Sequence, residues 1–218
     1  MTILAIECSG KVVSLALAVE DDRFELTLDR GFRHAETLMP AVDALVRLAG
    51  IEARRLDLVA CSAGPGSFTA LRIGMSTAKG LARGADAALK AVPTLPVLAA
   101  GREHWPGIVV PVMDARKKRI YAAAFRKGQR LRPDADIELE AFFDDLPGEE
   151  SVLVTGPDAE IAAGRPGVVV DPRYAEGRGR ALLEAARSAW DAEGGDPPDI
   201  GPIYLRLSEA EEALQADP

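Results

Sequence analysis

The order of strand-like and helix-like segments predicts an α/β protein of two lobes, each a mixed β-sheet flanked by helices. Two observations carry this prediction. Three strand-like segments follow one another at the start of each half of the chain, and helical segments separate the later strands. The chain has 218 residues, which is enough for two small domains. We expect an N-terminal lobe in residues 1–104 and a smaller C-terminal lobe in residues 105–218.

The first half predicts three strands, then a helix, a strand, a helix and a short strand, in residues 3–8, 12–20, 23–29, 35–49, 56–62, 69–83 and 89–93. Gly50 ends the first helix, because glycine readily adopts the left-handed conformation that closes one. This helix is the crossover that a parallel pairing of the first and fourth strands requires. The order is that of a ribonuclease-H-like unit.

The second half repeats this plan. Strands are expected in residues 108–113, 119–126 and 128–137, a short helix in 139–146, two further strands in 151–155 and 168–170, and an amphipathic helix in 179–193. The two halves share the order of elements and no matching residues. Two ribonuclease-H-like units in one chain are the architecture of the actin, Hsp70 and sugar-kinase superfamily.

Composition narrows the range of partners. Apolar residues make up 48% of the chain, and no stretch approaches the ~20 apolar residues of a membrane span, so we expect a cytoplasmic protein without membrane contact. Two cysteines, Cys8 and Cys61, are expected to be buried free thiols. A net charge of −8 disfavours direct binding of nucleic acid. The basic run Arg116–Arg119 fits a solvated hairpin turn or an RNA contact, and both interpretations remain open.

A glycine loop, Ala63-Gly64-Pro65-Gly66-Ser67, joins an apolar strand to a helix. A helix that begins after such a loop can bind an anion, because its first N–H groups lack partners. The loop matches neither the P-loop nor the dinucleotide fingerprint, so a tight turn explains it equally well. The candidate nucleotide- or anion-binding residues, taken from this loop and from the ends of the first strand of each half, are Glu7, Ser9, Gly64, Gly66, Ser67 and Asp114.

Catalytic and metal-ligating residues are not predicted. The two histidines, His34 and His104, have no ligand partner at helical spacing, so no metal site is expected. Ser67 is not in a GxSxG elbow, which makes a peptidase the least favoured of the enzyme alternatives.

The two helices of the first half carry apolar residues on more than one face, and the second also carries small residues four positions apart. Because one sheet covers only one face of a helix, we expect the remaining apolar surface to bind a partner protein. The alternative is that both faces are buried within the chain. The residues expected to bind the partner are Leu38, Ala41, Ala44, Leu45, Leu48, Ala70, Gly74 and Ala78.

The segment GPGSFTALRIGMSTAKGLA, residues 64–82, resembles the signature of the bacterial TsaB family, also called YeaZ. Four other segments fit the family in the same order, namely ILAIECS, HAETLMP, MDAR through Tyr121, and PIYLR at residues 202–206. The chain departs from the family at Glu7, where Asp is usual, and at Ala70, where Gly is usual. Both departures weigh against phosphate binding by these loops. At position 70, the Cβ of alanine keeps a ligand further from the backbone than glycine would.

This resemblance implies an accessory subunit without catalytic residues or a cofactor of its own. Family members help to make threonylcarbamoyladenosine in tRNA by binding TsaD, a catalytic relative, and TsaE joins the complex. The resemblance therefore implies contact with tRNA only through the complex, and ATP or ADP at the interface with TsaD. The apolar surface that the sheet leaves uncovered on the two helices predicts a weak homodimer when the chain is alone. A stand-alone ATP-dependent kinase or transferase that uses Glu7, Asp114 and the two glycine loops is the alternative.

Overall fold

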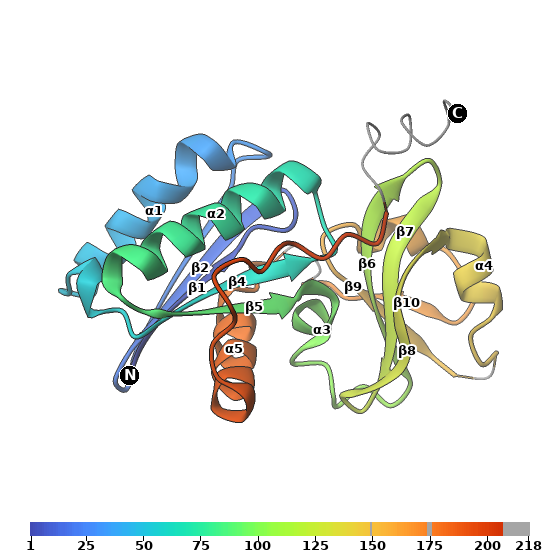
Figure 1. Ribbon diagram of the computed structural model, residues 1–218. Helices are drawn as coiled ribbons and strands as arrows, with labels where there is room; N and C mark the ends of the chain where they lie inside the picture. The colour runs from blue at the N-terminus through green and yellow to red at the C-terminus, as the bar shows by residue number, and fades with distance from the viewer. Residues whose placement is uncertain (149, 174–175, 207–218) are drawn as a thin grey trace.

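Two five-stranded sheets lie side by side and are flanked by helices, as the computed structural model shows for residues 1–148, 150–173 and 176–206 (Figure 1). The first sheet has the order β3-β2-β1-β4-β5, and the second has the order β10-β9-β6-β7-β8. If the strands of each sheet are numbered within their own lobe, both orders are identical. The predicted two-lobe ribonuclease-H-like architecture is therefore confirmed.

The first sheet comprises β1 (Thr2–Glu7), β2 (Val12–Val19), β3 (Asp22–Asp29), β4 (Leu58–Gly64) and β5 (Ala88–Pro93). β1, β2 and β3 pair antiparallel, whereas β1, β4 and β5 pair parallel. The parallel pairs are connected through α1 (His34–Leu48), a short 3-10 turn η1 (Ala53–Arg55) and α2 (Phe68–Ala85). Each observed element lies within a few residues of its predicted range.

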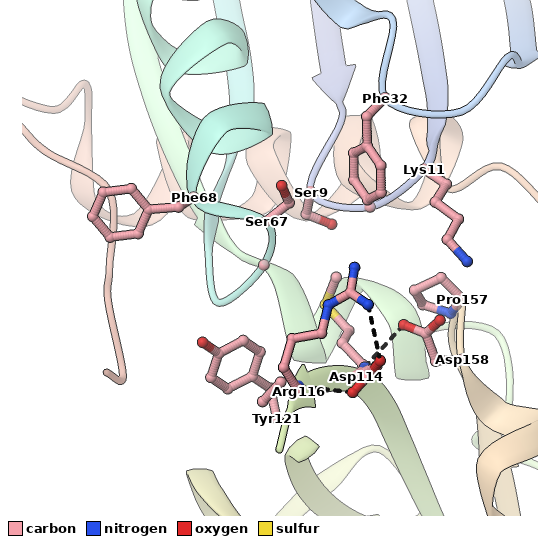
Figure 2. Close-up of a pocket in the computed structure, with 14 residues that line it drawn as sticks. Ser9, Lys11, Phe32, Ser67, Phe68, Asp114, Arg116, Tyr121, Pro157 and Asp158 are labelled. Atoms are coloured by element: carbon pink, nitrogen blue, oxygen red, sulfur yellow. Dashed lines mark hydrogen bonds and ion pairs between the residues drawn. The ribbon is translucent and has the colours of Figure 1, made fainter. Parts of the chain in front are cut away.

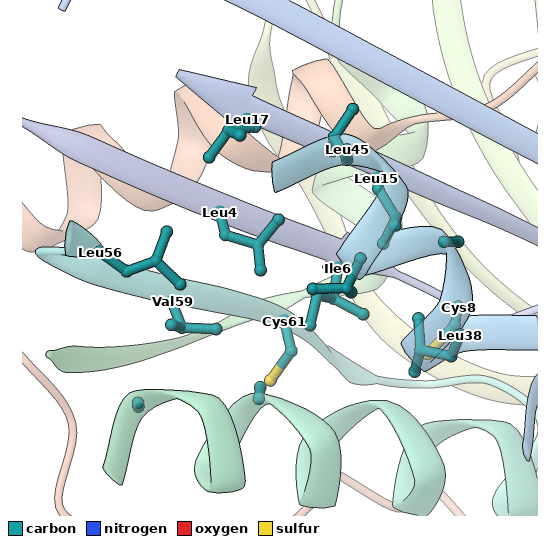
Figure 3. Close-up of a cluster of buried hydrophobic side chains, with 14 of the residues drawn as sticks. Leu4, Ile6, Cys8, Leu15, Leu17, Leu38, Leu45, Leu56, Val59 and Cys61 are labelled. Atoms are coloured by element: carbon teal, nitrogen blue, oxygen red, sulfur yellow. The ribbon is translucent and has the colours of Figure 1, made fainter. Parts of the chain in front are cut away.

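Alternate residues of this sheet face two different hydrophobic layers, as the two-residue period of a strand requires. Leu4, Ile6 and Cys61 point toward α1 and α2, and this layer is drawn in Figure 3. Ile3 and Ala60 point to the opposite face, where α5 (Gly179–Glu193) covers the sheet. The first sheet is therefore buried on both faces.

The second sheet comprises β6 (Ile108–Arg116), β7 (Arg119–Arg126), β8 (Gln129–Glu138), β9 (Val152–Thr155) and β10 (Val168–Val170). One face packs against α4 (Leu139–Asp144) and a 3-10 turn, η2 (Ala159–Ala162). The other face packs against α3 (Thr94–Ala99), whose Leu95 and Leu98 contact the layer that includes Val109 and Met113. No prediction anticipated α3.

The two lobes exchange helices. α3 follows the last strand of the first sheet and packs on the second sheet, whereas α5 follows the last strand of the second sheet and packs on the first. Figure 1 shows α5 beneath the sheet of the first lobe. The predicted assignment of residues 105–218 to one C-terminal lobe is therefore wrong for α5, because Leu182, Leu183 and Ala186 complete the core of the first lobe.

Cys8 and Cys61 are buried and free, as predicted. Among the residues that the structure describes, no helix is both long and apolar enough to cross a membrane.

Candidate functional site

A pocket of about 270 Å³ lies between the lobes (Figure 2). The first lobe lines it with the turn between β1 and β2 and with the loop between β4 and α2. The second lobe lines it with the end of β6 and the loop after β9. The lining residues are Ser9, Gly10, Lys11, Phe32, Gly66, Ser67, Phe68, Met113, Asp114, Ala115, Arg116, Tyr121, Pro157 and Asp158. The pocket thus joins four of the six candidate anion-binding residues: Ser9, Gly66, Ser67 and Asp114.

Two cationic side chains face the pocket from opposite lobes. Figure 2 shows Lys11 on the side of the first lobe and Arg116 on the side of the second. The Arg116 side chain is 76% exposed, and its guanidinium lies 3.9 Å from Asp114 Oδ2, which is a weak ion pair. The pocket therefore offers positive charge to a ligand from both walls.

Asp114 organises the wall of the second lobe. Its Oδ1 accepts a 2.7 Å hydrogen bond from the Arg116 backbone N–H, and its own backbone N–H donates to Asp158 Oδ2 at 2.9 Å. The hairpin tip is unusual because Arg116, Lys117 and Lys118 all have positive φ, at 66°, 53° and 62°. Non-glycine residues adopt that conformation only at an energetic cost. The basic run is therefore a tight β-hairpin turn whose first side chain borders the pocket.

The glycine loop is shaped by close packing within the chain. An ideal Cβ on Gly66 would lie 2.6 Å from the Ser9 carbonyl oxygen, and a Cβ on Gly64, whose φ is +117°, would lie 2.4 Å from the Ile203 carbonyl oxygen. The Ser67 backbone N–H, at the start of α2, donates a 2.8 Å hydrogen bond to the Ser9 carbonyl oxygen. A ligand therefore cannot use that N–H, and the tight-turn interpretation accounts for both glycines.

Glu7 does not line this pocket. It is 5% exposed, and its Oε1 accepts hydrogen bonds from the backbone N–H and the hydroxyl of Ser9, at 2.9 and 2.5 Å. Burial raises the pKa of Glu7, and the hydrogen bonds from Ser9 oppose that rise. Glu7 borders a separate cavity of about 20 Å³ together with Arg178. The two candidate acidic residues, Glu7 and Asp114, therefore line different cavities.

Metal ligands do not converge in the described part of the chain, where no three His, Cys, Asp or Glu side chains are suitably grouped. His34 is buried at the start of α1, and its Nε2 lies 2.8 Å from the Gly10 carbonyl oxygen. His104 is exposed in the turn between the lobes.

The prediction for the partner-binding residues was wrong in most positions. Six of the eight are buried within this chain and cannot meet a partner on its surface: Leu38, Ala41, Leu45, Ala70, Gly74 and Ala78. Three of them belong to the face of α1 that covers β2, and three belong to the face of α2 that covers β4. The small residues of α2 allow the helix to approach its own sheet and not a second protein.

Two of the predicted residues, Ala44 and Leu48, are exposed on α1. Leu48 is the most exposed large apolar side chain of the described residues at 72%, and Met39 of the same helix is 49% exposed. Phe32, just before α1, is 52% exposed. Ala44 and Leu48 stand four positions apart and so share one side of α1; they are called the α1 surface below.

A family model and curated relatives both connect this chain with proteins of threonylcarbamoyladenosine formation in tRNA. Residues 31–149 match the family model described as TsaD, tRNA N6-adenosine threonylcarbamoyltransferase. The chain is 31% identical to the tRNA threonylcarbamoyladenosine biosynthesis protein TsaB of Bacillus subtilis, over 97% of this chain and 96% of that protein. It is 32% identical to TsaB of Escherichia coli over 59% of this chain and 57% of that protein.

A solved structure shares the fold over nearly the whole chain. YeaZ from Pseudomonas aeruginosa superposes with a TM-score of 0.79 at 26% sequence identity, covering 94% of this chain and 99% of that one. The likeness therefore extends over both lobes.

Proposed function

The chain belongs to the TsaB (YeaZ) family, and on that basis we propose that it is a subunit of the complex that attaches the threonylcarbamoyl group to the adenosine beside the anticodon of tRNAs. The supporting observation is the match to TsaB of Bacillus subtilis along 97% of the chain. In this proposal the chain works in the cytoplasm, binds TsaD, is joined by TsaE, and contacts tRNA only within the complex.

The α1 surface is the proposed docking site for TsaD. Leu48 is 72% exposed, although fully burying a leucine side chain is worth about 1.5–3 kcal/mol. A partner that covers Leu48 gains that free energy. Without TsaD, a second copy of the chain covers the same surface in a weak homodimer.

The chain itself is proposed to be non-catalytic. Glu7 is enclosed and bonded to Ser9, and Asp114 is engaged in shaping its own hairpin. In the described part of the chain, neither histidine hydrogen-bonds to Ser67, so a serine nucleophile lacks a base there. ATP or ADP is proposed to bind at the interface with TsaD and not as a cofactor of this chain.

One observation favours the alternative, a stand-alone ATP-dependent kinase or transferase. Lys11 and Arg116 face one pocket from both lobes, and two cations so placed suit a phosphorylated ligand. Nucleotide hydrolysis by the pure chain, abolished when Lys11 and Arg116 are both changed to alanine, would support that alternative.

The test compares two leucine variants. Leu48→Glu places a charge on the α1 surface, and Leu131→Glu places the same charge on β8, where Leu131 is 41% exposed. With TsaD from the same organism, Leu48→Glu is expected to lose the heterodimer in sedimentation and to lose tRNA modification in a reconstituted mixture with TsaE and ATP. Leu131→Glu is expected to retain both.

Full pairing and modification by Leu48→Glu would reject the α1 surface as the docking site. Modification of tRNA by the isolated chain, with multiple turnovers, would reject the accessory role.

A further inference from the structure

The segment Pro202–Arg206, whose sequence PIYLR is one of the segments that fit the TsaB family, passes from one lobe to the other. Figure 1 shows this last described part of the chain running along the first lobe beside β4 and reaching the second lobe near β6. It touches both lobes within a few residues of one another, beside the pocket.

Its first end is bound to the first lobe. The Ile203 backbone N–H donates a 2.7 Å hydrogen bond to the Ala63 carbonyl oxygen at the end of β4. The ring of Tyr204 stacks on Phe68, the first residue of α2, with centroids 4.1 Å apart and planes 17° apart. Arg72 completes the contact, because its guanidinium lies 4.0 Å from the Phe68 centroid and its Nε donates to Tyr204 Oη at 3.0 Å.

Its second end is bound to the second lobe through Arg206. The guanidinium makes a two-pronged contact with Asp136 of β8, with 2.7 Å between Nε and Oδ2 and 3.1 Å between Nη2 and Oδ1. Its Nη1 donates to the Ala115 carbonyl oxygen at 2.8 Å. The Arg206 and Asp136 side chains are only 20% and 9% exposed, so solvent weakens this pairing less than it would a surface ion pair.

We propose that residues 202–206 form a latch that fixes the separation of the two lobes and thereby the width of the pocket. Three residue steps separate Ile203 from Arg206; that length of backbone spans at most about 11 Å, to which the Arg206 side chain adds its own length. While both ends are bound, the end of β4 and the end of β6 can separate no further than this tether allows. Phe68 and Ala115, which the latch contacts, both line the pocket.

Release of Arg206 would remove the contacts of this segment with Asp136 and Ala115, while the chain connections and the helix exchange still join the lobes. The lobes would then rotate apart about those links, and the pocket would open. This device concerns motion within one chain and does not depend on the docking of TsaD.

The test measures the interlobe distance in the full-length protein. Glu25 of β3 and Asp144 of α4 are exposed, one in each lobe, and can be changed to cysteine for paramagnetic labels while Cys8 and Cys61 stay buried. Arg206→Ala is expected to broaden the distance distribution and shift it to larger values, and to accelerate amide exchange of the β6–β7 hairpin. Arg206→Lys, which keeps the positive charge and loses the two-pronged contact with Asp136, should give a smaller shift in the distance.

Arg187→Ala is the matched control, since Arg187 is an exposed arginine that pairs with Asp191 of its own helix, and it should leave the distribution unchanged. An unchanged distribution in folded Arg206→Ala would overturn the latch. If Arg206→Ala does not fold, the test rests on folded Arg206→Lys, and a wild-type distance distribution in that variant would overturn the latch. Leu48→Glu should not move the distribution, so the latch and the proposed function fail separately.

Discussion

Gly74 lets α2 approach the first sheet, and its substitution gives the sharpest test of that packing. An ideal Cβ at this position would lie 2.1 Å from the Sγ of Cys8, which is 1% exposed at the end of β1. Ordinary non-bonded contacts are about 3.5–4.0 Å, so helix and strand would have to separate by roughly 1.5 Å. Overpacking of this kind costs about 1–3 kcal/mol.

Gly74→Ala also gains about 0.5–1 kcal/mol, because alanine is the better helix former. The net expectation is a loss of up to about 2.5 kcal/mol in the free energy of unfolding. For a chain of this length that corresponds to a fall in melting temperature of a few degrees, at ~2–4 °C per kcal/mol.

Gly80→Ala is the matched control in the same helix. A Cβ there meets no atom within 4 Å, so this change should raise stability by about 0.5–1 kcal/mol. Cys8→Ala removes the obstructing sulfur, so the double variant Cys8→Ala with Gly74→Ala should be more stable than the sum of the single effects by about 1 kcal/mol. Thermal and urea unfolding of all four variants provide the measurement. A stabilising Gly74→Ala, or strictly additive effects with Cys8→Ala, would refute the packing argument.

Three further predictions concern charge and reactivity. Because the pKa of Glu7 is raised in the folded state, that state holds the proton more tightly than the unfolded state does. The free energy of unfolding should therefore fall as pH rises above about 4.5. Glu7→Gln should reduce this fall, as measured by unfolding from pH 4 to 8. Burial raises the pKa of Cys61 to about 12 and that of Cys8 well above its usual range, so neither thiol should react with a thiol reagent until the chain unfolds, and native labelling would contradict this. With a net charge of −8, the isolated chain should bind tRNA only weakly at physiological salt, and tight binding with a steep salt slope would implicate Arg116–Arg119.

The sequence located most strands and helices because each has a clear period. The alternation in β2 and the stripe of α1 mark their buried faces directly. α3 was missed because TLPVLA is six residues long and contains a proline, which is too short to show a helical repeat. Its role, covering the sheet of the other lobe, is a tertiary property that no local pattern records.

The same limit explains the wrong lobe assignment of α5. An amphipathic stripe such as Leu182, Leu183 and Ala186 indicates that a helix covers a sheet, and it does not indicate which sheet. The prediction of exposed partner-binding residues on α2 was wrong for a related reason. Counting apolar faces on α2 treats the helix as a cylinder above one flat sheet, whereas Gly74 and Ala78 bring it into close contact with β1 and β4. Leu48 lies outside that contact and is exposed, so its role in binding a partner stays a prediction.

The glycine loop shows how a motif can be functional without holding a ligand. Gly64 makes room for the carbonyl of Ile203, and Gly66 makes room for the carbonyl of Ser9. Gly64 therefore makes room for the segment that crosses to the second lobe, and Gly66 makes room for the turn at Ser9, which lies on the same wall of the pocket as the loop. A side chain at either position would displace a pocket wall even though neither glycine need touch a ligand. Positive charge for any anion comes instead from Lys11 and Arg116, so the loop sets the shape of the pocket and the two cations set its charge.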